Sequence, residues 1–242
     1  MTKPNKKQIR LIHTSDLHIG EDYRTGFGFD DGGCRLLKAL VDLSLSVEAH
    51  LVVIAGDFFD NNQVGAARVD MVVRELARAL VPVVILPGNH DCLVRDTVYR
   101  RIDFAELTPN IRIFTSPEGE RFVFSELGLA IWGKAINSYE GEFRPMAGVP
   151  PRGGEDWQIA VAHGYYAGDS IDKVYSYQIS EAEIVQSGYD YVALGHWGVF
   201  RCVCDRPVKS CYSGSASQTG KAVIVDLLGD GGIHLELQPL PL

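Results

Sequence analysis

The sequence predicts an α/β fold, and two observations support this class. Short apolar runs alternate with amphipathic stretches along the chain, and polar residues or glycine follow the apolar runs of its first half. No repeat or low-complexity linker interrupts the pattern over 242 residues, a length that suits one large domain or two small ones. We therefore expect one domain over residues 1–242, in which the Gly- and Pro-rich segment Gly141–Gly154 is a loop.

The first half of the chain predicts alternating strands and helices. Short runs rich in Val, Ile and Leu are typical of buried strands, and apolar residues that recur every three or four positions are typical of helices. In chain order, the expected elements are a strand over Ile9–Thr14, a helix over Cys34–Val47, a strand over Leu51–Ala55, a helix over Ala66–Leu80, a strand over Val83–Leu86 and a helix from beyond Asp96 to Leu107.

The second half predicts mainly strands. The one helix that we expect there begins after Ser180, because Ser180 and Glu183 have the spacing of a capping box. The expected strands are Ile111–Phe114, Arg121–Phe124, Leu129–Trp132, Gln158–Ala162, Tyr191–Leu194, Val199–Val203, Val208–Tyr212, Ala222–Leu227 and Ile233–Leu237.

Composition limits the classes of function. No apolar run approaches the roughly 20 residues that span a bilayer, and no apolar segment follows the basic start MTKPNKKQIR as it would in a secretory signal. We expect a soluble, cytoplasmic protein without a membrane partner. The net charge of −8 argues against a broadly basic surface that coats nucleic acid. If the protein handles phosphodiesters, bound cations must supply much of the positive field.

The five cysteines are sparse and odd in number, which does not resemble a disulfide framework. We therefore expect reduced thiols. Cys202, Cys204 and Cys211 offer an alternative, a thiolate metal site across a hairpin, but the C-x-C spacing lacks the second Cys or His pair of such sites.

Residues with Asp, Asn or His side chains follow five of the predicted strands. They are Asp16 and His18, then Asp57 and Asp60, then Asn89, His90 and Asp91, and finally His163 and His196. Ligands of α/β sheets bind outside the carboxyl ends of the strands. In an extended segment, residues two apart project to the same side, so we expect Asp16 and His18 to reach one ion.

Each of these features has an ordinary structural explanation when it is taken alone. D-x-H, G-D and N-H-D are common in turns, and a single histidine beside apolar strands is more often a core residue. The combination favours a functional site, because four of the seven histidines lie at predicted strand ends.

The donor types indicate a catalytic metal centre. Imidazole, carboxylate and amide oxygen without thiolate suit Mn, which we expect, with Fe, Zn or Mg as alternatives. Asp57 is placed to bridge two ions. Paired ions about 3.5–4 Å apart activate water and hold the attacking and leaving oxygens during displacement at phosphorus.

The order of the motifs resembles that of the calcineurin-like metallophosphoesterases. The family pattern occurs here as SDLH, GDFFD, GNHD, AHG and GHWG, and the resemblance runs from Ile9 to about Ser217. Within the superfamily, IRLIHTSDLHIG, LPGNHD and YSGS (Tyr212–Ser215) are most similar to the SbcD-type DNA repair exonucleases. The resemblance implies a two-sheet β-sandwich flanked by helices, with a dimetal site at the sheet edges.

The resemblance also implies roles for single residues. Asp16 and His18 would bind the first ion, Asp57 would bridge, and the second ion would be completed by Asn89, His163 and His196. His90 would protonate the leaving oxygen or stabilise the phosphorane. Asp91 would orient His90 or be a solvated turn residue, and Asp60 would support the metal loop or cap the next helix. Ser213 of YSGS is a candidate substrate-binding residue.

The chain departs from the family pattern at Gly198, where a second histidine would complete the first metal site. His13 is a poor substitute, because in a regular strand it points away from Asp16. Two interpretations of Trp197 stay open, a packing residue or a base-stacking surface. Phe27 and Phe29 lie in a loop that forms a substrate lip or an ordinary connection. No separate capping domain of the SbcD type is evident.

Together these features predict a metal-dependent phosphoesterase, either a phosphodiesterase or a nuclease acting on DNA. The alternatives are a cyclic-nucleotide or small-molecule phosphodiesterase and a degenerate member that binds DNA or protein without catalysis, which the substitution at Gly198 favours. The resemblance suggests a homodimer and an SbcC-like ATPase partner.

Overall fold

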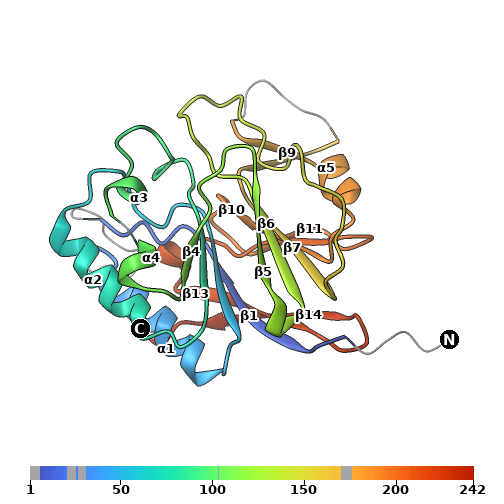
Figure 1. Ribbon diagram of the computed structural model, residues 1–242, viewed down its shortest axis with the longest axis horizontal. Helices are drawn as coiled ribbons and strands as arrows, with labels where there is room; N and C mark the ends of the chain where they lie inside the picture. The colour runs from blue at the N-terminus through green and yellow to red at the C-terminus, as the bar shows by residue number, and fades with distance from the viewer. Residues whose placement is uncertain (1–5, 21–25, 27–30, 103, 170–175) are drawn as a thin grey trace.

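Two six-stranded sheets pack face to face, with helices on their outer sides (Figure 1). The computed structural model describes residues 6–20, 26, 31–102, 104–169 and 176–242. Strand β2 (Leu51–Ala55) of the first sheet contacts β7 (Trp157–His163) and β10 (Tyr191–Gly195) of the second across the interface. The predicted α/β class and the sandwich are both confirmed.

The first sheet is parallel at its centre. Its strand order is β14-β13-β1-β2-β3-β4, with β1 (Ile9–Thr14), β3 (Val83–Leu86), β4 (Ile111–Ile113), β13 (Lys221–Leu227) and β14 (Ile233–Pro239). Strands β1 to β4 run parallel, whereas β13 and β14 are antiparallel to their neighbours. The carboxyl ends of these four parallel strands therefore lie at one edge.

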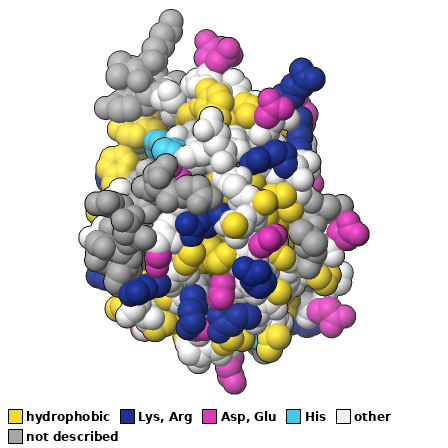
Figure 2. Space-filling view, turned by 90° about the vertical axis from the view of Figure 1, so that its left-hand side faces the viewer, with side chains coloured by type: hydrophobic (Ala, Val, Ile, Leu, Met, Phe, Trp, Pro, Cys, Tyr) yellow, Lys and Arg dark blue, Asp and Glu magenta, His cyan; other side chains and the backbone are white. Residues whose placement is uncertain are grey.

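Helices cover the outer side of the first sheet. They are α1 (Cys34–Ser46), α2 (Ala66–Ala77), α3 (Val98–Arg101) and α4 (Phe104–Leu107). The single helix expected from beyond Asp96 to Leu107 is wrong, because Ile102 is extended and separates α3 from α4. Figure 2 looks onto this side, where Lys and Arg side chains are interspersed with Asp and Glu. None of the helices in the described residues is long and apolar enough to cross a membrane.

The second sheet has the order β11-β12-β10-β7-β6-β5, with β5 (Glu120–Phe124), β6 (Leu129–Gly133), β11 (Arg201–Cys204) and β12 (Lys209–Tyr212). Helix α5 (Glu181–Ser187) packs outside it, and the predicted capping box of Ser180 and Glu183 is present. Four short elements were not predicted: η1 (Ser125–Leu127), β8 (Tyr165–Gly168), β9 (Gln178–Ser180) and α6 (Ala216–Thr219). Each is too short to show a period. The loop over 141–154 is confirmed.

The central strands of the second sheet are buried on both faces. In β7, Ile159 and Val161 face the core between the sheets, whereas Ala160 and Ala162 face a second core that includes Ile184 of α5. This alternation follows from the period of two along a strand. Strand ends that emerge from two cores are rigid supports for a site.

The cysteine prediction is partly wrong. Cys202 and Cys211 form a disulfide, because the antiparallel register of β11 and β12 places them directly opposite each other. Cys34, Cys92 and Cys204 are free, and the Cys204 thiol contacts the Arg206 carbonyl. The alternative of a three-thiolate metal site is therefore also wrong.

Candidate metal centre

The polar residues predicted at five strand ends converge at one edge of the sandwich. Strands β1, β2 and β3 of the first sheet and β7 and β10 of the second all point their carboxyl ends there. Two glycines permit this close approach, because a Cβ at Gly56 would overlap the His163 imidazole and one at Gly195 would overlap the Ala55 carbonyl. The convergence predicted from sequence is thus confirmed.

Four of the converging residues have a left-handed backbone. The values of φ are 54° at Asp16, 50° at His18, 50° at Asp57 and 101° at His196. Such conformations cost of order 1–3 kcal/mol each and cluster at functional sites. Asp16 and His18 do approach each other, but the expected extended segment is wrong. The backbone turns at both residues, held by hydrogen bonds from Asp16 N–H to the Gly56 carbonyl and from His18 N–H to the Asp57 carbonyl.

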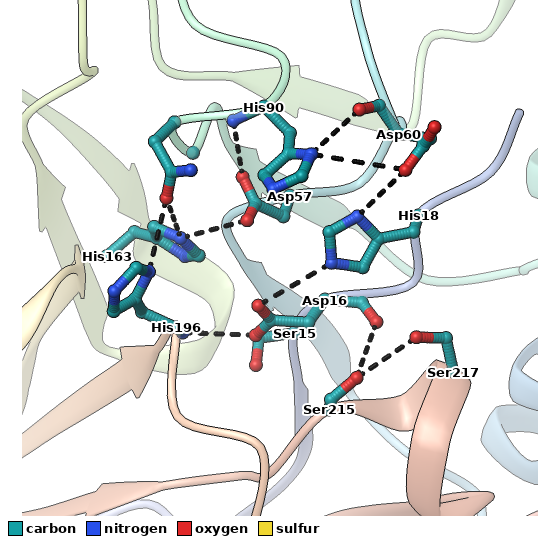
Figure 3. Close-up of polar contacts among 12 residues, drawn as sticks. Ser15, Asp16, His18, Asp57, Asp60, His90, His163, His196, Ser215 and Ser217 are labelled. Atoms are coloured by element: carbon teal, nitrogen blue, oxygen red, sulfur yellow. Dashed lines mark hydrogen bonds and ion pairs between the residues drawn. The ribbon is translucent and has the colours of Figure 1, made fainter. Parts of the chain in front are cut away.

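One half of the centre is compact. Ligand atoms of Asp57, His163 and His196 all lie within 4.8 Å of one another. The amide oxygen of Asn89 lies 3.0 Å from His163 Nε2 and 3.1 Å from His196 Nδ1, and His163 Nε2 lies 3.2 Å from Asp57 Oδ2 (Figure 3). This half contains every residue that the resemblance assigned to the second ion.

The other half shares Asp57 with the first, and we call it the open half because its ligand atoms lie farther apart. Ligand atoms of Asp16, His18 and Asp57 also lie within 4.8 Å of one another, although His18 Nε2 is 3.9 Å from Asp16 Oδ1. Gly198 has no side chain to add. His13 cannot substitute, because it is buried in the core and bonded to the Tyr191 hydroxyl and the Leu194 carbonyl.

Asp60 stands between two histidines at the open side of the centre. Its backbone carbonyl lies 2.9 Å from His90 Nδ1, and its carboxylate oxygen Oδ1 lies 3.4 Å from His18 Nδ1 and 4.0 Å from His90 Nδ1. It does not cap the next helix, whose N-cap is Gly65. Of the two expectations for Asp60, support of the metal loop fits the geometry.

Asp91 does not orient His90 as expected, nor is it a solvated turn residue. Its carboxylate is fully buried and accepts hydrogen bonds from the N–H groups of Phe59 and Gly88 and from the Tyr99 hydroxyl. Burial, helped by the Asp57 charge, raises the pKa of Asp91 to about 6. Asp91 therefore links the GNHD loop to the loop after β2 and to α3.

The attraction between Asp57 and His163 sets the protonation state of the compact half. Burial alone would raise the pKa of Asp57, but the neighbouring imidazoles, chiefly His163, bring it well below its ordinary range. Burial likewise opposes a charge on His163, but Asp57 outweighs it and raises the pKa of His163 to about 9. Burial and the His163 charge lower the pKa of His196 to about 4. Without a metal, the buried pair is an imidazolium and a carboxylate at neutral pH.

The donor set fits divalent metal ions. Carboxylate and amide oxygens and imidazole nitrogens from the ends of five strands lie close together, and four of the residues that carry them have a left-handed backbone. Nitrogen and oxygen donors without thiolate suit Mn, Fe, Zn or Mg. His90 and His196 are exposed, so the centre is open to solvent on that side.

The structure bears on two of three other sequence predictions. Ser213 is buried and its hydroxyl contacts that of Ser15 at 2.9 Å, so direct contact with substrate stays a prediction. Trp197 packs against Tyr165 and Tyr212, with the Arg201 guanidinium 5.6 Å from the centre of its ring, which favours packing. Phe27 and Phe29 lie outside the described residues.

Sequence reasoning missed the segment after Ser213. The Ser215 hydroxyl donates to the Asp16 carbonyl at 3.2 Å and contacts the Ser217 hydroxyl, and Ser217 N–H donates to the same carbonyl (Figure 3). This segment therefore fixes the position of the Asp16 backbone. The YSGS similarity indicated that the segment matters but not which contacts it makes.

Known proteins resemble this chain over most of its length. It is 22% identical over 201 residues to the DNA double-strand break repair protein Mre11 of Nanoarchaeum equitans and 23% identical over 205 residues to that of Methanopyrus kandleri. It is also 22% identical over 211 residues to the uncharacterized metallophosphoesterase YhaO of Bacillus subtilis. These matches cover 77–78% of this chain but 44–48% of each relative, so the chain spans about half the length of these relatives.

Solved structures share the fold. The crystal structure of TT1561 of Thermus thermophilus matches with a TM-score of 0.64 at 15% identity, covering 96% of this chain and 98% of that one. The structure of an archaeal phosphodiesterase matches with a TM-score of 0.52 at 14% identity, covering 95% and 100%. At these identities the likeness concerns the fold alone.

The family model of the calcineurin-like phosphoesterases matches residues 9–200. That range contains every candidate ligand, from Asp16 to His196, and both halves of the centre. This chain therefore belongs to the calcineurin-like phosphoesterase family.

Proposed function

We propose that this protein is a metal-dependent phosphodiesterase that uses two divalent ions, with Mn as the expected metal. The observation that carries the proposal is the sharing of Asp57 by two groups of ligand atoms, each within 4.8 Å. A carboxylate with two oxygens between two such groups is suited to bridging a pair of ions. In this assignment Asp16 and His18 hold the first ion, and Asn89, His163 and His196 hold the second.

The ions, when bound, supply an activated water and positive charge that neutralises the phosphate oxygens. The protein's own groups position these charges. Asp57 Oδ1 accepts a hydrogen bond from the His90 N–H, so the carboxylate that would bridge the ions also fixes the backbone of the expected proton donor. The net charge of −8 means that bound cations must attract a phosphodiester to this edge.

His90 is placed to transfer a proton to the leaving oxygen. Its Nδ1 carries a hydrogen, because the Asp60 carbonyl that it contacts can only accept. The proton exchanged with substrate must then be on Nε2, the other ring nitrogen. The side chain is 45% exposed, which leaves it accessible to a bound phosphodiester.

Nucleic acid or nucleotides are the substrates that we propose. The Mre11 relatives support this choice, as does the archaeal phosphodiesterase of the same fold. A surface depression of about 460 Å³ is lined by Val199, Phe200, Ser213, Thr219, Lys221 and Leu237, and it offers apolar side chains and one cation to a nucleotide. A DNA end, a cyclic nucleotide and a small phosphodiester share this chemistry. A second copy and an SbcC-like ATPase are partners proposed from the resemblance alone.

Hydrolysis of an activated phosphodiester such as bis(p-nitrophenyl) phosphate with Mn tests the proposal. We expect turnover that His90→Ala lowers by about 10²–10⁴-fold while both ions stay bound. His234→Ala, a change of an exposed histidine on β14, is the matched control and should leave turnover intact. If protein that contains two ions shows no turnover, this would contradict catalysis and favour the alternative of a degenerate member that binds DNA or protein. Competition between single-stranded DNA and cyclic nucleotides then separates the substrate classes.

A further inference from the structure

The space beside Gly198 is occupied by the side chain of a residue outside the family motifs. A Cβ added at Gly198 would lie 3.2 Å from the amide oxygen Oε1 of Gln218, the one atom of the described residues within 4 Å apart from the chain neighbours of Gly198. A side chain at position 198 would therefore lie in close contact with the Gln218 amide.

The backbone that carries Gln218 is fixed to both sides of the open half. The Ser215 N–H donates to the Gly198 carbonyl at 3.1 Å, and its hydroxyl donates to the Asp16 carbonyl at 3.2 Å. The Ser217 N–H donates to the same Asp16 carbonyl at 3.3 Å. Because Gln218 follows directly in helix α6, these bonds fix the position of its backbone relative to Asp16 and Gly198.

The Gln218 amide is available to a ligand. The Gln218 backbone N–H donates to the Ser215 carbonyl, but no described residue forms a hydrogen bond with the Gln218 side chain. The residue is exposed, so the amide can rotate without breaking a packed core. Amide oxygens are ligands of hard divalent cations, as are carboxylates.

We propose that Gln218 Oε1 takes the place of the missing histidine and completes the first metal site with Asp16, His18 and Asp57. This inference rests on the proposed function, since it presumes that this half binds an ion. The exchange of an imidazole for an amide oxygen makes the donor set harder. The first site should therefore favour Mn or Mg over Zn more strongly than a site completed by histidine would.

Equilibrium binding of Mn tests this proposal without any measurement of turnover. Free Mn can be counted by its electron paramagnetic resonance signal during a titration of wild type and Gln218→Ala. We expect Gln218→Ala to loosen the weaker of two ions by about 10-fold and to leave the tighter ion unchanged. Gln186→Ala on α5, outside the second sheet, removes another exposed glutamine and should change neither.

The conservative variant makes the test specific to the oxygen donor. Gln218→Glu keeps an oxygen at the same reach, so the weaker ion should bind at least as tightly as in wild type. Unchanged Mn affinity in Gln218→Ala, or equal losses in Gln218→Ala and Gln218→Glu, would overturn the proposal. These outcomes differ from failure of the proposed function, in which wild type itself binds no pair of ions.

Discussion

The two halves of the metal centre differ in how they are completed. The half around His163 is built entirely from family motifs, with Asn89 Oδ1 within 3.1 Å of two imidazoles and His163 in contact with Asp57. The half around His18 lacks the motif histidine at Gly198, and its nearest candidate replacement is Gln218. One half of a metal site can therefore be built from motif residues alone, while the other half depends on a residue from a neighbouring segment.

The difference extends to charge. In the compact half, the attraction between Asp57 and His163 outweighs the effect of burial and holds a proton on the imidazole until a metal displaces it. In the open half, burial lowers the pKa of His18 even though Asp57 and Asp16 oppose the shift, which favours a neutral ring ready to bind metal. We therefore expect the two ions to differ in affinity and in pH dependence.

Asp57→Asn should weaken metal binding in both halves, because both share this carboxylate. We expect Mn affinity of both halves and turnover to fall by more than about 100-fold, beyond the loss typical of residues that only support a ligand. Asp70→Asn, an exposed carboxylate on α2, is the control. Retention of one tightly bound ion in Asp57→Asn would show that the halves do not share a bridge.

Lower pH should weaken the compact half. The pKa of His163 is raised to about 9, so at neutral pH metal binding must release its proton. Mn affinity of the tighter site should rise by about 10-fold per pH unit between pH 6 and 8, since each unit lowers the competing proton concentration 10-fold. Calorimetry in buffers of different ionisation enthalpy measures the released proton. Binding that is independent of pH would contradict the imidazolium assignment.

Gly198→His should make the halves more alike. An added imidazole at the expected family position should tighten the weaker ion by about 10-fold in the Gln218→Ala background, where the amide no longer competes for the space. Titrations with Mn and Zn check both the gain and a shift in preference toward Zn. If Gly198→His leaves the affinity of Gln218→Ala protein unchanged, position 198 does not face the first ion.

Tyr99→Phe should change stability with a small effect on either half. It removes one hydrogen bond to the buried Asp91 carboxylate, which keeps its bonds from Phe59 and Gly88. Above pH 6, where Asp91 is ionised, we expect a loss of about 1.5–3 kcal/mol in the free energy of unfolding in urea. A loss of Mn binding without loss of stability would instead assign Asp91 a role at the metals.

The sequence was sufficient to predict what depends on local period and on strand ends. Strands β1, β2, β3 and β7 and the capping box at Ser180 follow from patterns within a few residues. The convergence of Asp57, Asn89 and His163 follows from the rule that ligands lie at carboxyl ends of strands. These predictions needed no knowledge of side-chain direction.

Other features depend on distant packing and could not be predicted. The direction of Asp91 is set by donors on the turn after β3 and on α3, and the disulfide of Cys202 and Cys211 by hairpin register. Gln218 is 20 residues from Gly198, and the two approach because the segment that leads into α6 is bonded to Gly198 and to the loop after β1. Spacing within a motif carries no information on such contacts.

A titration of metal-free protein with Mn is the most direct test of the two-ion centre. We predict two ions per chain with distinct affinities, the weaker one sensitive to Gln218→Ala and the tighter one to pH through His163. Binding of no ion, of a single ion, or of two ions with equal affinity and equal response to both changes would contradict it.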